Sequence, residues 1–596
     1  MHKTWGDNDI YYRKLTYYEG LTVVEDLSGN RTEYHHDDGV VYKTVDPKGG
    51  ISLTVRNETG DIIQETDEEG LTTTYSYDER GNLLGVVNPN GSAVSYTYEN
   101  DIAIAATDAG GGNWIWIRNE EGKVVQQINP IGLITQYEYT NGLLTAVIRN
   151  DGARTEILYD QQFNVAELRL PDGNSSSWTF DALGRCIEYT DVYGGTQFRR
   201  FDNLGRVIEI TEVDGNKIFF KYNGEGEVIH VKDKVREVEF EYQGMGKMAQ
   251  RKENNTKLEF IYDKEEQLIG IRNEKGTPYN FKLDPLGNVT EEIGFDGIKK
   301  RFARDKAGKV TSVQRPDNKI TKYEYDDGGR ITKVIQHDDL TEIFTYDLAG
   351  NLVEAANDNI LLKFERDKLG RVKKERQGDF ITESLFDDKG TRVGLKSSAG
   401  ANIRIDRNVM GDVSAMSATN GDSTWEAKLQ SDEMGLEVLR ELPGGLQSRW
   451  QRDKLGRPLE HVVTKGKTLH RSRQYLWDYD DRLKKMIDQI QGETQFGHDA
   501  VGNLTWAKYN DGFIEYRIAD ETGNYYKTKD KSDRKFGPAG QILESRNTKF
   551  EYDAEGNLIR KLLKDGKEWQ YQWYSNGMLK RSSGPTKRKY HSLMIR

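Results

Sequence analysis

The stretch Tyr-Ser-Tyr-Asp-Glu-Arg-Gly-Asn-Leu at residues 75–83 returns along this chain with small changes, and its return decides the fold. Further copies occupy residues 323–331, 344–352 and 550–558. The motif aspartates recur at a constant interval of twenty-one residues, at Asp263, Asp284, Asp305, Asp326 and Asp347. A fixed period of about 20 to 50 residues marks supersecondary units that stack and bury together what none of them buries alone. We therefore expect a repeat array.

Each copy of the motif predicts a β-hairpin. An Asp followed three residues later by Gly fits a type I turn, because the Asp side chain accepts a hydrogen bond from the backbone two residues on. The Gly takes positive φ at low steric cost, and a bulge closes the loop. The Tyr-x-Tyr before the turn places both rings on one face of a strand. We expect positive φ at Gly81, Gly287, Gly350 and Gly556.

A second turn signal lies about half a repeat away from each motif. Examples are Asn-Pro-Asn-Gly at 88–91, Pro-Asp-Gly at 171–173 and Phe-Asp-Gly at 295–297. A turn every ten residues or so leaves strands of about five to seven residues. The prediction is an all-β, continuous antiparallel ribbon with almost no helix. Its tyrosines would form a cross-strand ladder whose hydroxyl groups can stay in water.

Composition limits how such a ribbon is used. Only 35% of the 596 residues are apolar, and the mean hydropathy is -0.79. A filled sandwich core needs more apolar residues, whereas a thin wall that is wetted on both faces, or that surrounds a polar cavity, needs fewer. We expect one repeat array over residues 1–579 that spirals into a hollow shell or partial shell, followed by a basic tail at 580–596.

The chain shows no pattern typical of nucleic-acid binding, membrane insertion or secretion through a leader. Its formal net charge is -12, with both signs mixed along the ribbon, which disfavours attraction to nucleic acid or anionic membranes. No apolar stretch approaches the roughly 18 residues of a membrane span, and the first residues contain no apolar signal core. We expect neither a transmembrane segment nor a signal peptide.

We also expect no catalytic, cofactor or metal site. The nine histidines lack metal-ligand spacing, and neither a Gly-x-Ser-x-Gly nor a phosphate-loop motif occurs. Each motif aspartate is already used by its own turn. The single cysteine, Cys186, lies at an apolar strand position and is read as structural.

Two tryptophans stand out as candidate contact residues. A glycine cluster at 110–112 replaces the usual turn and leads into Trp114-Ile-Trp116. The pair could form an aromatic platform for a glycan or a cargo polypeptide, or it could be a variant repeat that fills the ordinary slot. The repeat also loses register at 405–430 and 510–545, where we expect bulges or surface excursions.

The repeat resembles the YD or RHS repeat of bacterial Rhs proteins, the B and C components of insecticidal toxin complexes, wall-associated proteins and the teneurin shell. Residues 281–289 and 450–458 are typical of bacterial members. The resemblance implies a β ribbon that spirals into a shell around a toxic C-terminal polypeptide, which a specialised secretion system delivers to other cells. Asp284-Pro-Leu-Gly287 matches the Asp-Pro-x-Gly pattern of the segment that ends the core of such proteins. Because it lies in the middle of the array, we interpret it as the turn of an ordinary repeat.

Two functional hypotheses remain in competition, with an enzyme acting alone as a third. The first is a shell that holds a toxin polypeptide, supplied in the same chain or enclosed with a partner shell component. The second is a surface protein that recognises glycans through exposed aromatic side chains. Polar walls around a lumen would favour the first, and a shallow aromatic groove on the outer face would favour the second.

Overall fold

The computed structural model describes residues 2–6, 10–585 and 589–591, and it confirms the all-β prediction. The order runs from β1 (His2–Thr4) to β59 (Lys589–His591). Within the described ranges the helical structure is limited to a 3₁₀ turn at Pro316–Asn318. No helix among these residues has the length and apolar character needed to cross a membrane.

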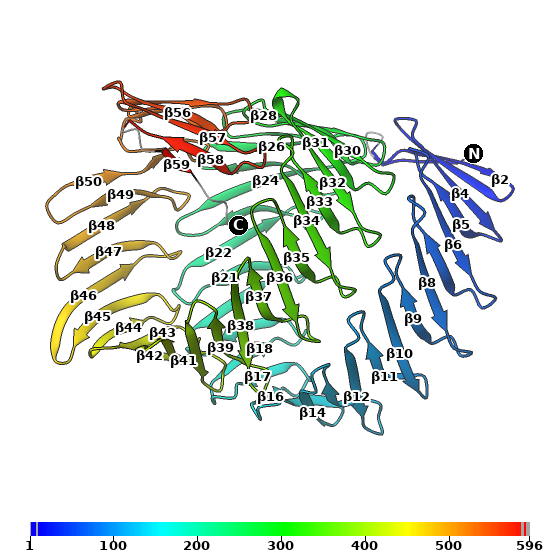
Figure 1. Cartoon of the computed structure of the whole chain (residues 1–596), viewed down its shortest axis with the longest axis horizontal. Coiled ribbons are helices and arrows are strands. Elements are labelled where there is room, and N and C mark those ends of the chain that lie inside the picture. The colour runs from blue at the N-terminus through cyan, green and yellow to red at the C-terminus, as the bar shows by residue number, and fades with distance from the viewer. Residues whose placement is uncertain (1, 7–9, 586–588, 592–596) are drawn as a thin grey trace.

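The strands follow one another in sequence order, and consecutive strands within each sheet pair antiparallel (Figure 1). Fifty strands, up to β50 (Ile514–Tyr516), form one sheet. A two-stranded sheet of β51 (Ile518–Ala519) and β52 (Tyr525–Tyr526) comes next. A seven-stranded sheet then begins at β53 (Arg534–Phe536). The interruption falls inside the predicted irregular segment 510–545.

One repeat shows how the sequence produces the hairpin. Strands β8 (Thr72–Tyr77) and β9 (Leu83–Val87) are joined by the turn that Asp78 opens. The Asp78 Oδ1 atom accepts hydrogen bonds from the backbone N–H of Arg80 at 2.9 Å and of Asn82 at 2.9 Å. The pairing shifts by one residue beside Tyr77, which is the expected bulge. Gly81, Gly287, Gly350 and Gly556 have φ values of 86°, 82°, 86° and 83°, so that prediction is confirmed.

Two kinds of turn lie on opposite edges of the ribbon. We call the Asp-x-x-Gly turns that follow the aromatic strands motif turns, and the intervening ones return turns. Because successive strands run antiparallel, all motif turns share one edge and all return turns share the other. This segregation sets how the ribbon can stack on itself.

The ribbon winds into a spiral in which consecutive coils touch edge to edge. Lys48 of a return turn bonds Asp284 of a motif turn at 3.0 Å. Further along, Lys454 Nζ of a motif turn donates to the Gly194 carbonyl of a return turn at 3.0 Å. The partners are 236 and 260 residues apart, so the 596-residue chain completes more than two coils. We call this line of contact between coils the seam.

The wall is one sheet thick, and the described residues form no filled core. The buried hydrophobic side chains of the described residues are small and scattered, and they are Ala146, Ala153, Val238, Val334, Leu340, Ala427 and Ala507. The accessible surface is 35285 Å², whereas a compact protein of 68.2 kDa exposes about 21,000 Å². The excess is the surface of a thin wall that is solvated on both faces, as predicted.

Candidate functional site

The wall itself is the first candidate functional structure, and a repeated hydrogen bond joins its successive repeats. The hydroxyl of Tyr77, the second motif aromatic, donates to the carbonyl of Ile62 in the previous repeat at 3.0 Å. Tyr346 makes the same bond to Ile331 at 3.0 Å. Trp573 Nε1 donates to Leu558 at 2.8 Å, and Arg366 Nε donates to Leu352 at 3.1 Å. We call this bond the donor clamp.

The donor clamp corrects one expectation and explains the residue choice. These hydroxyl groups are not left to water as the sequence-based ladder proposed, because each is committed to the preceding repeat. Tyr, Trp and Arg share only an O–H or N–H group at the end of a long planar side chain. The slot therefore accepts different donors that can reach the carbonyl, although Phe180, Phe201, Leu283 and Phe386 occupy it without one.

The residue after the motif glycine makes a second link, in the forward direction. In the repeat at 326–330, Arg330 Nε donates to the Asp326 carboxylate at 2.8 Å. Its Nη1 atom donates to the carbonyl of Asp347 at 2.9 Å, and its guanidinium lies 4.9 Å from the ring centroid of Tyr346. In the equivalent turn at 181–185, the hydrogen bond from Arg185 holds the pKa of Asp181 below its ordinary value.

The opposite face of the wall carries cross-strand ion pairs. On β29 (Val289–Ile293), Glu291 accepts from Arg301 at 2.9 Å and lies 3.0 Å from Lys282. The hydrogen bond from Arg301, followed by that from Lys282, lowers the pKa of Glu291 to about 2. Glu209 is held in the same way by Arg200 at 2.6 Å and Lys217 at 2.8 Å. This face combines multiply paired charges with exposed apolar side chains, such as Phe219 directly opposite Glu209.

The seam relies on polar contacts between turn tips. Lys275 of a return turn lies 2.5 Å from Asp520 of the next coil. Burial opposes ionisation of Asp520, but hydrogen bonds from Lys275 and Asn524 outweigh it and leave the pKa well below its ordinary value. Near the C-terminal coil, Glu555 pairs with Arg315 at 2.8 Å and also with Lys319. Charge pairs and main-chain bonds therefore connect the coils.

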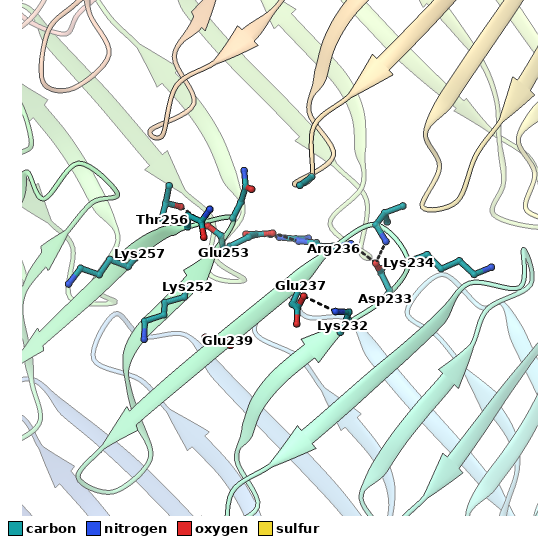
Figure 2. Close-up of a pocket in the computed structure, with 14 residues that line it drawn as sticks. Lys232, Asp233, Lys234, Arg236, Glu237, Glu239, Lys252, Glu253, Thr256 and Lys257 are labelled. Atoms are coloured by element: carbon teal, nitrogen blue, oxygen red, sulfur yellow. Dashed lines mark hydrogen bonds and ion pairs between the residues drawn. The ribbon is translucent and has the colours of Figure 1, made fainter.

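A cavity of about 650 Å³ opens in the seam between residues 232–257 and Ala500 of the next coil. Figure 2 shows the Arg236–Glu253 and Lys232–Glu237 ion pairs inside it, with Lys252 and Lys257 extending away. Two short return turns line this cavity. Asp233 and Arg236 close a four-residue turn, and Asn254-Asn255 form a two-residue turn. These short return turns leave a space in the seam that the longer return turns fill elsewhere.

One pair of side chains has a spacing that is known from catalytic sites. Ser448 Oγ and His461 Nε2 are 2.9 Å apart, which is the spacing of a nucleophile and its base. However, His461 Nδ1 is buried without a partner in the described structure, so no carboxylate orients the ring. Burial, then Arg473 and Arg471, lower the pKa of His461, and its ring stacks on Trp450 at 3.8 Å. Over the described ranges, no group of three metal-ligating side chains was found.

The structure places Trp114 and Trp116 on one face of β12 (Asn113–Arg118), half-buried. Trp114 Nε1 donates to Asp108 Oδ2 at 3.2 Å, which ties its ring to the preceding turn. Across the ladder, Trp114 faces Ala106 and Trp116 faces Gln127. They occupy ordinary repeat slots, and their contact with a glycan or cargo stays a prediction.

The predicted basic tail at 580–596 lies partly outside the described residues. Strand β58 (Leu579–Ser583) continues the ribbon across the first of its residues and pairs with β59. The boundary between the array and the tail stays a prediction.

Comparisons with known proteins agree with this architecture. Residues 56–93, 77–112 and 304–339 match the RHS Repeat family model, and residues 147–282 match the Teneurin YD-shell model. No curated protein matches the chain.

Solved structures of toxin complexes show the same fold. The TcdB2-TccC3 crystal structure superposes with a TM-score of 0.67 at 11% identity, covering 96% of this chain and 39% of that one. A TcdB2-TccC3-Cdc42 structure gives 0.67 at 11% identity, over 95% and 41%. The Photorhabdus luminescens Tc holotoxin pore gives 0.53 at 11%, over 98% and 37%. The chain thus spans about two fifths of the length of these structures.

Proposed function

We propose that this chain, a member of the RHS/YD-repeat family, forms part of a hollow shell that encloses a toxic polypeptide for delivery to other cells. The observation that carries the proposal is the single-sheet wall, which is solvated on both faces and coiled edge to edge. A coil of this kind surrounds space rather than filling it. Nothing in a binding module or a compact enzyme requires so much exposed surface.

The chemistry of the wall suits a container. The donor clamps and ion pairs engage polar groups of the wall with one another, which leaves these groups less free to hold an enclosed chain. We expect the toxic chemistry to belong to the enclosed polypeptide and not to this chain. Because the chain spans about two fifths of the similar structures, we infer that a partner shell component or further chain completes the wall. Delivery through a specialised secretion system belongs to the same proposal.

Small-angle scattering of the purified chain tests the hollow form. A compact body of 596 residues has a radius of gyration of about 25 Å, and the coil should exceed this value clearly. A protease-protection assay then tests enclosure. An unfolded reporter fused after residue 596 should be cleaved more slowly on the parent chain than on a seam variant carrying Lys48→Asp, Lys275→Asp and Lys319→Asp.

The seam variant is the matched control, because it keeps every hairpin and alters only contacts between coils. If the reporter on the parent chain is digested as fast as the free reporter, enclosure by this chain is wrong. A radius near the compact value would refute the hollow form as well.

A further inference from the structure

A cavity of about 480 Å³ lies where the C-terminal coil meets strands β31 (Val310–Gln314) to β34 (Thr341–Tyr346). Its apolar lining comprises Val313, Tyr323, Ile331, Val334, Phe344 and Tyr346. Tyr323 and Phe344 occupy the first aromatic slot of two consecutive motifs. The regular repeat therefore supplies two aromatic rings to one floor, on strands β32 (Ile320–Tyr325) and β34, with Val334 of β33 (Ile331–Ile335) between these strands.

The C-terminal coil supplies a wall that other repeats lack. The turn at 574–577 docks on two return turns, because Arg315 Nη1 donates to the Ser575 carbonyl at 2.6 Å and Ser575 N–H donates to Asp338 Oδ2 at 3.2 Å. These bonds bring Ser575 and Asn576 to the edge of the aromatic floor. The cavity is therefore a product of coil stacking.

Buried polar side chains surround the apolar floor. Thr321 is 5% exposed, Gln336 8%, Glu342 8% and Ser575 9%. Arg315 Nη2 donates to Thr321 Oγ1 at 3.1 Å, and Thr321 Oγ1 donates to Gln336 Oε1 at 2.9 Å. Asn576 Nδ2 finds no hydrogen-bond partner among the described residues. Buried polar groups held by their neighbours and facing an apolar floor are the features of a ligand site.

We propose that this cavity binds a hexopyranose sugar. A pyranose ring presents an apolar C–H face, which stacks on aromatic rings, and hydroxyl groups at its edge that both donate and accept hydrogen bonds. The floor of Tyr323 and Phe344 fits the first property, and the amide and hydroxyl groups of Gln336, Asn576 and Thr321 fit the second. The volume falls in the range of about 300 to 1,000 Å³ that is usual for small-ligand pockets.

A peptide ligand fits the cavity less well. Peptides commonly bind sheets by adding a strand to a free edge. Strands β31 to β34 are each paired on both sides, from β30 (Lys299–Arg304) through β35 (Leu352–Ala356), so no edge is free there. The site is also separate from Trp114 and Trp116, which lie on β12.

Saturation-transfer NMR on the full chain tests the proposal with glucose, mannose, galactose, N-acetylglucosamine and their disaccharides. At least one sugar should bind saturably, and Tyr323→Ala and Asn576→Ala should each weaken it by tenfold or more. Tyr137→Ala is the matched control, because it removes the first motif aromatic from β14 (Ile134–Thr140), outside the cavity. Far-UV circular dichroism confirms folding of each variant.

Several results would overturn the assignment. They are the absence of binding by every sugar at millimolar concentration, equal weakening by Tyr323→Ala and Tyr137→Ala, and loss of binding through Trp114→Ala instead. Saturable binding of the tripeptide Gly-Tyr-Gly in place of the sugars would assign the cavity to polypeptide. Because the assay uses the empty chain, its outcome is independent of whether the shell encloses a toxin.

Discussion

Removal of one donor clamp tests how the repeats are joined. Tyr346→Phe keeps the ring, and with it the contact to Arg330, but deletes the hydroxyl that donates to Ile331 at 3.0 Å. A typical hydrogen bond of this kind contributes about 0.5 to 1.5 kcal/mol net. In a repeat array the loss falls on the modified repeat and its neighbours. A change of about 1 kcal/mol corresponds to roughly fivefold faster local opening.

Hydrogen exchange with mass spectrometry measures that opening directly, whereas a single melting temperature is poorly defined for a long array. Peptides that cover residues 325–350 should exchange about fivefold faster, and peptides half a coil away should not change. Tyr323→Phe is the control from the preceding hairpin, on β32 (Ile320–Tyr325), since no hydrogen bond from its hydroxyl is found in the described ranges. If both variants exchange alike, the clamp does not join the repeats.

Three further predictions concern the turns, the charged face and the seam. Gly350→Ala should destabilise by on the order of 1 kcal/mol or more, because φ is 86° there, while Gly224→Ala, where an added Cβ meets open space without positive φ, should be neutral or stabilising in chemical denaturation. Glu291 has a pKa of about 2 against an ordinary 4.5, so its stabilising charge is complete above about 4.5 and is lost as pH falls toward 2. Glu291→Gln should flatten that part of the profile of resistance to chemical denaturation against pH, and an unchanged profile would contradict the assignment. Raised salt should increase the radius of gyration of the parent chain by loosening the coils, with no loss of strand signal in circular dichroism, and the seam variant should already be expanded at low salt.

The hairpin could be predicted from the sequence because every signal for it is local. Asp78 and Gly81 are three residues apart, so the turn they form follows from their own side chains. The interruption near 510–545 was visible for the same reason, as a loss of register. The sequence also contains a signal for the donor clamp. Tyr346, Trp573 and Arg366 occupy the same position of the motif, and the property that they have in common is a hydrogen-bond donor.

The contacts between coils could not be predicted. Lys48 and Asp284 are 236 residues apart, and no local pattern marks them as partners. Their meeting depends on the small twist and bend that each hairpin adds, summed over a whole coil. The cavity at Tyr323 and Asn576 depends on that same sum, so neither its residues nor its chemistry could be read from one repeat.

The return turns nevertheless record where one coil meets the next. From residue 46 to residue 340, return turns close with a bond from one N–H to the carbonyl four residues on, as at Asp46, Asn88 and Arg315. The exceptions in that span are the turns at 233–236 and 254–255, and those two line the open cavity in the seam. After residue 340, lengths vary, with two-residue turns at 378–379, 421–422 and 466–467. Return turns need a uniform length only where the next coil packs against them at a constant distance. The length of the turns along this edge therefore indicates which part of the ribbon contacts the next coil.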